Sequence, residues 1–210
     1  MNAFARIALL ILAGLLLAPA HARSTLGTDI GTPVALPAAG PRVALETNQG
    51  RIVIELYPEK SPATVANFLG YVRDGHYNGT IFHRVVSDFL LQGGDYTVDL
   101  QAKPERAPIQ NEANNGLSNL RGTISAARKR GEKDSARSQF FINTVDNRQL
   151  DYRGEQPPAM TGYCVFGRVV EGMDVIDKIR TVATGKRGPF AADVPLAPVV
   201  VERAMVVDAK

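Results

Sequence analysis

The chain has 210 residues, of which 45% are hydrophobic and 21% charged, with one cysteine and no tryptophan. This length and near-average composition exclude a disordered tail and a small disulfide-stapled protein, and they predict one globular domain. The net charge is +3, from 24 Lys and Arg against 21 Asp and Glu. The electrostatic field of so small a net charge is too weak to indicate nucleic-acid binding unless the basic residues cluster.

The first 22 residues have the pattern of a secretory signal peptide. Arg6 supplies a positive start, residues 7–17 form an unbroken apolar run, and residues 20–22 (Ala-His-Ala) match a cleavage site. The run is too short for a membrane span, which needs about 20 apolar residues. We therefore expect cleavage of residues 1–22 and export of the remainder without a stable membrane anchor. The alternative is an uncleaved anchor.

A flexible lead-in and a hairpin follow the predicted signal peptide. Residues 23–41 are rich in Gly, Pro, Ala and Thr without an apolar period, so we expect them to be a flexible segment before a domain over 42–210. Residues 43–47 and 51–57 alternate with period two around the turn residues 48–50. This pattern is typical of a β-hairpin.

Two helices and six further strands are predicted after the hairpin. Ser61 as N-cap, Pro62 at the first helical position and Gly75 as a stop predict a helix over Ala63–Asp74, and a second is predicted over Gly172–Thr181. Short β-like runs occur at Thr80–Val86, Phe89–Gln92, Gly122–Ala127, Gln139–Asn143, Cys164–Val169 and Val199–Val207. Many short strands with two helices favour a mostly antiparallel barrel or sandwich.

The residue types that carry common catalytic chemistries are sparse after residue 22. His76 and His83 do not stand at metal-ligand spacing, and no nucleophile elbow or phosphate-binding glycine loop is present in the sequence. We interpret His83 as a hydrogen-bonded structural side chain rather than a general base, and Cys164 as a buried, unreactive thiol. Acidic residues interrupt the basic segment 128–137, which favours a solvated loop over a nucleic-acid patch.

Apolar and amide residues concentrate in four of the predicted strand regions. Strand alternation places Phe82 and Arg84 on one face unless a bulge intervenes, and it makes Phe140 and Phe141 core residues on opposite faces. An arginine among apolar neighbours needs a polar partner, and Gln92 is the nearest candidate.

The same regions resemble the cyclophilins, a family of peptidyl-prolyl cis/trans isomerases. Residues 82–95 (FHRVVSDFLLQGGD) are similar to the most specific signature of the family, and further matches follow in family order at 122–127 (GTISAA), 138–142 (SQFFI) and 163–167 (YCVFG). The resemblance covers about residues 42 to 207. It implies a mostly β fold, a closed eight-stranded antiparallel β-barrel capped by two α-helices. Within the family, the chain resembles the bacterial exported cyclophilins most, through the segments 111–114 (NEAN), 133–135 (KDS) and 172–175 (GMDV).

The resemblance also implies roles for individual residues. Arg84 matches the catalytic arginine, and Gln92 matches the glutamine that hydrogen-bonds beside it. Ala127 and Arg128 fall where a strand edge aligns the substrate backbone, and Tyr163 falls where many eukaryotic members have histidine. The pocket for the proline ring corresponds to Phe89, Leu90, Phe141 and Leu150.

Two positions depart from the usual family pattern. Leu90 replaces a methionine, a volume-conserving change that the pocket should tolerate. Gln149 replaces an aromatic residue, often tryptophan, that helps hold cyclosporin. We therefore expect weak cyclosporin binding.

The implied function is isomerisation of X-Pro bonds in exported polypeptides during folding, in the bacterial periplasm. No bond breaks in this reaction, so we expect no metal and no cofactor; the resemblance also implies a monomer. A non-catalytic proline-peptide binding module or holdase would use the same groove and is the alternative. A third reading, nucleic-acid binding through residues 128–130, is disfavoured. The pair Arg84 and Gln92 favours the isomerase.

Overall fold

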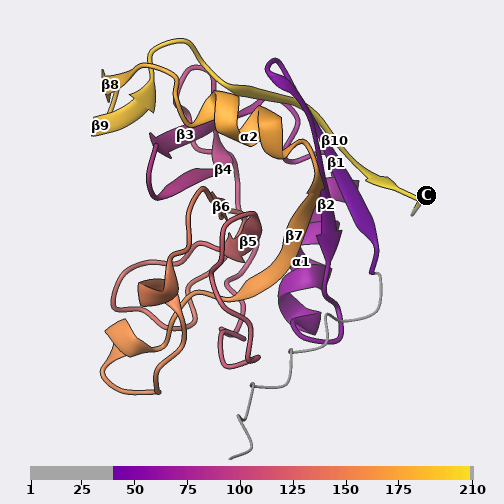
Figure 1. The fold of residues 1–210 in the computed structure, drawn as a ribbon, viewed down its shortest axis with the longest axis vertical. Coiled ribbons are helices and arrows are strands. Elements are labelled where there is room, and N and C mark those ends of the chain that lie inside the picture. The colour runs from indigo at the N-terminus through magenta and orange to yellow at the C-terminus, as the bar shows by residue number, and fades with distance from the viewer. Residues whose placement is uncertain (1–39, 209–210) are drawn as a thin grey trace, which may run out of the picture. The chain divides into compact units, whose positions relative to one another are not determined.

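The structure is a computed structural model that describes residues 40–208, and its strands close into a barrel (Figure 1). The predicted signal peptide and all but the end of the predicted lead-in lie outside the described residues. The barrel order is β1-β10-β3-β4-β6-β5-β7-β2 with antiparallel neighbours. The strands are β1 (Arg42–Thr47), β2 (Gly50–Leu56), β3 (Thr80–Val86), β4 (Leu90–Thr97), β5 (Thr123–Ala126), β6 (Phe140–Asn143), β7 (Val165–Glu171) and β10 (Val200–Val207).

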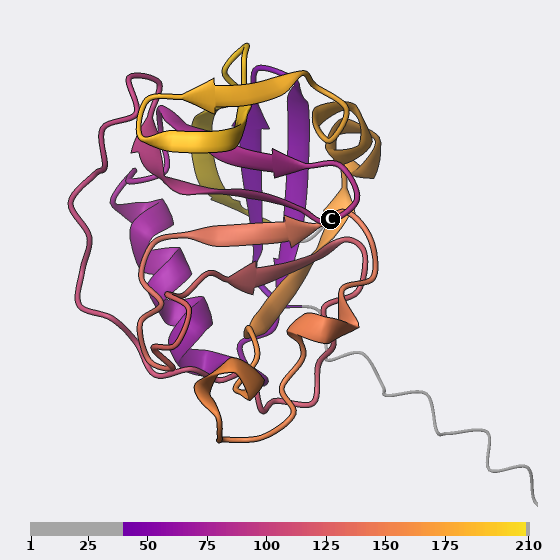
Figure 2. The same ribbon diagram turned by 90° about the vertical axis from the view of Figure 1, so that its left-hand side faces the viewer.

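Two helices complete the barrel, α1 (Pro62–Arg73) and α2 (Met173–Ile179), and they lie on opposite sides of it (Figure 2). The predicted eight-stranded antiparallel barrel with two helices is therefore confirmed. Among the described residues, no helix is long and apolar enough to span a membrane.

The core lies between the barrel wall and α1. Phe68 of α1 packs with its ring centroid 5.2 Å from Tyr77, 5.2 Å from Phe166 and 5.7 Å from Phe140. Alternate residues of the first hairpin, such as Leu45 and Ile54, are fully buried in the same cluster. The period-two pattern of the sequence thus reflects one face of each strand turned inward.

The start of α1 is held by a residue distant in sequence. Ser61 occupies the N-cap position, but its hydroxyl donates to the Val165 carbonyl at 2.9 Å and does not cap the helix. The Glu112 carboxylate accepts the N–H groups of Ala63 at 3.0 Å and Thr64 at 2.8 Å instead. A carboxylate at a helix N-terminus satisfies free N–H groups and suits the helix dipole.

A bulge in β3 overturns the expected pattern of faces. The register with β4 shifts between Phe82 and Arg84, and both Phe82 and Val85 belong to the core. Arg84 therefore points away from the core, and the expectation that it shares a face with Phe82 is wrong because the bulge adds one residue. Phe140 and Phe141 are both buried, as predicted; only Phe140 belongs to the main core cluster.

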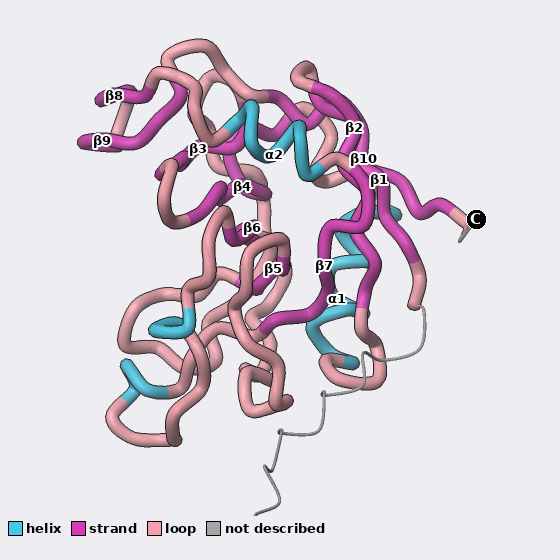
Figure 3. The backbone as a smooth tube through the Cα atoms, viewed as in Figure 1, coloured by secondary structure: helices cyan, strands magenta, loops and turns pink. Residues whose placement is uncertain are grey.

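One hairpin was not predicted from the sequence, the two-stranded sheet of β8 (Thr184–Arg187) and β9 (Phe190–Pro195). Phe190 packs against His83 of β3 and Tyr96 of β4, with ring centroids 5.5 Å and 5.0 Å apart. Long connections gather beside β5 and β6 (Figure 3). The outer face of β3, β4 and β6 lies between this hairpin and those connections.

Candidate active site

Three of the predicted functional side chains lie in a row across adjacent strands. Arg84 of β3 is the register partner of Gln92 of β4, and Gln92 is the partner of Phe141 of β6. Leu91 and Ile142, their chain neighbours, belong to the core. Because side chains alternate along a strand, the row Arg84, Gln92 and Phe141 stands on the outer face of the barrel.

Apolar side chains surround this row. The Phe141 ring lies 5.6 Å from the ring of Tyr163, and the Tyr163 N–H donates to the Leu150 carbonyl at 2.9 Å. Leu90 precedes Gln92 by two residues on the same face and is buried, while Phe89 lies under the Arg84 guanidinium at 5.7 Å. We call Phe89, Leu90, Phe141, Leu150 and Tyr163 the apolar patch. The structure joins Phe141, Tyr163 and Leu150 by direct contacts and places Phe89 and Leu90 beside Arg84 and Gln92 of the same row. The roles of all five in binding stay predictions.

Arg84 is held by a residue that sequence analysis missed. Its Nε lies 3.5 Å from Oδ2 of Asp193 in β9, and its side chain is 39% exposed. The expectation that Gln92 is the polar partner of Arg84 is wrong, because the Gln92 amide bonds elsewhere. Asp193 has a φ of +67°, an uncommon conformation for a residue other than glycine. No sequence signal marked it, since the hairpin that carries it was not predicted.

Gln92 belongs to a hydrogen-bonded chain of side chains. Its Nε2 donates to Oε1 of Gln139 at 2.8 Å, and Nε2 of Gln139 donates to Oδ2 of Asp95 at 3.0 Å. Asp95 is only 4% exposed. Burial, reinforced by the charge of Glu105, raises the pKa of Asp95 to about 6. We call Gln92, Gln139 and Asp95 the amide chain. Gln139 and Asp95 stood within the family motifs, but sequence analysis assigned them no role.

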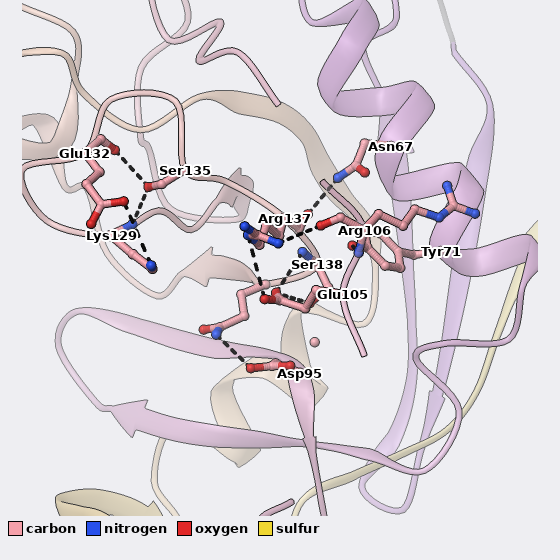
Figure 4. Close-up of polar contacts among 12 residues, drawn as sticks. Asn67, Tyr71, Asp95, Glu105, Arg106, Lys129, Glu132, Ser135, Arg137 and Ser138 are labelled. Atoms are coloured by element: carbon pink, nitrogen blue, oxygen red, sulfur yellow. Dashed lines mark hydrogen bonds and ion pairs between the residues drawn. The ribbon is translucent and has the colours of Figure 1, made fainter. Parts of the chain in front are cut away.

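A polar cavity of about 150 Å³ adjoins Gln92. Within it, Glu105 accepts a hydrogen bond from the Ser138 hydroxyl at 2.8 Å and lies 4.0 Å from Nε of Arg137 (Figure 4). Both signs of charge therefore meet beside the row. The lining residues are Gln92, Glu105, Ala127, Arg128, Lys129, Ser135, Arg137 and Gln139.

Ala127 and Arg128 border the cavity, and Arg128 also contacts the apolar patch. The Ala127 N–H donates to the Gln139 carbonyl at 3.0 Å, which fixes the end of β5. The Arg128 guanidinium lies 4.7 Å from the centre of the Tyr163 ring, and its Nε donates to the Gly162 carbonyl at 2.8 Å. Arg128 thus packs on the Tyr163 ring while it is hydrogen-bonded to the backbone at Gly162.

Comparison with known proteins decides the family. The sequence model described as cyclophilin type peptidyl-prolyl cis-trans isomerase/CLD matches residues 42–206, most of the chain. The chain belongs to this family. Its activity is the cis-trans isomerisation of peptidyl-prolyl bonds.

The relatives of this cyclophilin include bacterial isomerases that share about half of its aligned residues. It is 54% identical over 165 residues to peptidyl-prolyl cis-trans isomerase cyp18 of Streptomyces antibioticus, which covers 78% of this chain and 97% of the relative. It is 51% identical over 160 residues to peptidyl-prolyl cis-trans isomerase B of Escherichia coli K12, covering 76% and 96%. A Cryptosporidium parvum cyclophilin-type isomerase, crystallised in the presence of the dipeptide Ala-Pro, shares the fold with a TM-score of 0.66 at 22% identity, covering 80% and 99%.

His83, next to the catalytic candidate of this cyclophilin, is not the hydrogen-bonded residue expected. It is 4% exposed and packs against the rings of Tyr96 and Phe190, which also contact each other. Its Nδ1 finds no hydrogen-bond partner within residues 40–208. Burial, together with the charge of Arg84, lowers its pKa from 6.5 to about 4. We interpret this uncharged ring, packed against two aromatic side chains, as a packing residue.

Other predictions concern the surroundings of the site. Cys164 is buried and free, which confirms the predicted burial, and burial raises the pKa of its thiol. That the thiol is unreactive stays a prediction. In the segment 128–137 residues 129–132 and 134 are exposed and only Ala136 is buried, and Lys129 lies 3.9 Å from Glu132, as expected of a solvated loop. Gln149 is exposed, and weak cyclosporin binding stays a prediction. Among residues 40–208 no cluster of three or more potential metal ligands occurs.

Proposed function

We propose that this cyclophilin isomerises X-Pro bonds of exported proteins, with Arg84 as the catalytic group. The observation that carries the proposal is the row of Arg84, Gln92 and Phe141 on one outer face, bordered by the apolar patch. This order of groups suits a proline peptide. The apolar Phe141 would contact the proline ring, while the Arg84 cation and the Gln92 amide would hydrogen-bond the peptide backbone.

The chemistry required is the rotation of one amide bond. Resonance opposes rotation with a barrier of about 18–20 kcal/mol, and the uncatalysed exchange takes tens to hundreds of seconds. In the twisted transition state the prolyl nitrogen loses conjugation and becomes a better hydrogen-bond acceptor. A guanidinium aimed at this nitrogen binds the twisted form more strongly than the planar form. A thousandfold acceleration requires about 4 kcal/mol of this difference.

The surroundings of Arg84 suit this role. Asp193 and the Phe89 ring restrain the guanidinium from two sides, while 39% of the side chain stays open to a ligand. The apolar patch would take the proline ring, and Gln92 would hold the carbonyl before it. The Ala-Pro dipeptide used with the Cryptosporidium parvum structure supports a ligand of this kind.

The catalytic role is tested by replacing Arg84 with alanine. We expect kcat/KM for a proline peptide, measured by exchange NMR, to fall by about 10²–10³, the effect of removing a transition-state donor. Arg51→Ala, which removes an exposed arginine paired with Glu46 elsewhere on the barrel, serves as the matched control and should keep full activity. Unchanged exchange in Arg84→Ala contradicts the role. Saturable peptide binding without exchange in the wild type would instead support the holdase alternative.

We propose that the protein is exported, because residues 1–22 match the pattern of a signal peptide. After production of the full chain in a bacterium with a periplasm, we expect the protein in the periplasmic fraction to begin near Arg23, as read by mass spectrometry. Leu15→Arg, which interrupts the apolar run, should leave the chain in the cytoplasm at full length. Full-length wild-type protein retained in the cytoplasm contradicts the proposal.

A further inference from the structure

We propose that Asp95 is a positioning residue of the isomerase, whose ionised carboxylate sets the orientation of the Gln139 amide and, through it, of the Gln92 amide. The inference rests on the proposed role of Gln92 in holding substrate. Asp95 has no place in the row on the outer face, and it acts through the amide chain.

The direction of the amide chain follows from the chemistry of its buried end. An ionised carboxylate only accepts hydrogen bonds, so it must receive the Nε2 group of Gln139. The Oε1 of Gln139 then faces Gln92 and receives the Nε2 group of Gln92. The Gln92 amide nitrogen carries two hydrogens and uses one of them for Gln139, so the other stays available to donate to the substrate carbonyl from a fixed position.

Protonation of Asp95 removes this constraint. A neutral carboxyl group donates as well as accepts, so it can bond to either the oxygen or the nitrogen of the Gln139 amide. Both amides can then turn over without losing a hydrogen bond. The Gln92 atom that faces the substrate would no longer be fixed, and binding of the transition state would weaken.

The cost of this carboxylate argues for a role beyond packing. Its Oδ1 is buried without a hydrogen-bond partner within residues 40–208, and such an atom destabilises a fold. A neutral amide of the same shape would leave a polar atom at the same place but would bury no charge. Residues kept at a cost to stability concentrate at functional sites.

Several titratable or charged groups surround Asp95. Glu105, from the connection after β4, raises its pKa and is itself paired with Arg137, which precedes β6. The Lys103 N–H donates to the Asp95 carbonyl at 2.9 Å. Tyr96 is its chain neighbour. His76 reaches the adjacent Gly94 carbonyl at 3.1 Å. With the pKa of Asp95 at about 6, its charge is lost between neutral and mildly acidic solution.

The test is the pH profile of kcat/KM for an end-blocked proline peptide without titratable groups, measured by exchange NMR. In the wild type we expect a fall of about threefold to tenfold from pH 8 to pH 5, the equivalent of one hydrogen bond, with a midpoint near pH 6. Asp95→Asn should show the lower value at both pH values, with no midpoint. Parallel profiles of wild type and Asp95→Asn overturn the proposal.

Three controls assign the effect. His76→Gln should keep the midpoint, because that histidine lies outside the amide chain; its loss in this variant overturns the proposal. Glu105→Gln removes a negative neighbour and should move the midpoint to lower pH. Asp95→Asn should also unfold at a higher urea concentration than the wild type at pH 8, because it no longer buries a charge. A merely structural aspartate would lose stability instead, and that result counts against the proposal.

Gln92→Ala separates this proposal from the proposed role of Gln92. If Gln92→Ala lowers exchange and Asp95→Asn does not, Asp95 has no positioning role while the role of Gln92 stands. If Gln92→Ala keeps full activity, the proposed role of Gln92 fails first. If both proposed roles are correct, the variant that combines Gln92→Ala with Asp95→Asn should be no slower than Gln92→Ala alone. Asp95 acts only through Gln92, so its replacement has no further effect once Gln92 is gone.

Discussion

Arg84 illustrates how the site depends on single side chains from distant parts of the sequence. Its restraint comes from Asp193, more than 100 positions along the chain, and from the nearby Phe89 ring. The ion pair lies on the surface and contributes little to stability. Its value is directional, because it limits the orientations of a long, flexible side chain before substrate binds.

His83 gives a prediction for stability in acid. Its pKa is about 4 in the folded protein and 6.5 when unfolded, so its contribution is complete above pH 6.5 and is lost as the pH falls toward 4. The full loss is about 3 kcal/mol of unfolding free energy. His83→Phe should lack it, which urea denaturation at pH 7 and pH 4 would measure. An equal pH effect in wild type and variant contradicts the prediction.

Asp95 acts in the opposite sense over an overlapping range. Its pKa is raised from 3.8 to about 6, so its favourable contribution is complete below pH 3.8 and is lost as the pH rises through 6. The comparison of His83→Phe with the wild type is therefore required, because the net pH dependence of the wild type combines both residues.

Sequence analysis found the members of the site better than their partners. The segment from Phe82 to Asp95 gave Arg84 and Gln92, which the register places side by side. It did not give the bonds of either residue, because these depend on Gln139 and Asp193, which only tertiary packing brings close. Hydrogen-bond partners across strands carry no periodic signal.

At the scale of elements, α1 offers a prediction about its N-terminus. Glu112→Ala removes the acceptor of two helix N–H groups and should lower the unfolding free energy by about 1–2 kcal/mol, measured by urea denaturation. Glu59→Ala, an exposed glutamate close to the same helix start, is the matched control and should change stability by less than about 0.5 kcal/mol. Equal stabilities of the two variants would show that Glu112 is not the cap.

The elements themselves were predictable where their pattern is periodic. The helix expected over Ala63–Asp74 differs from α1 by one residue at each end, and Thr80–Val86 matches β3. The β8–β9 hairpin was missed because only two of its strand residues, Val194 and Pro195, are buried and its sequence shows no alternation of apolar and polar side chains. Its attachment through Phe190 depends on the rings of His83 and Tyr96.

For the whole molecule, composition and strand count left a barrel or a sandwich open. The order of strands is far from their order in the sequence: β10 lies between β1 and β3, and β6 lies between β4 and β5. Local patterns do not encode such pairings, and only the motifs shared with a family indicated closure. The site depends on one such pairing, because β3 and β4 form a local hairpin but β6 joins β4 only in the folded sheet.

The lone buried thiol of Cys164 has a consequence for where the domain can fold. The sequence holds one cysteine, so no disulfide within the chain supports the barrel, and non-covalent interactions stabilise it. A change in the redox potential of the surroundings therefore neither forms nor breaks a disulfide within this fold. We therefore expect the unfolding free energy of the domain to be the same in reducing and in oxidising solution.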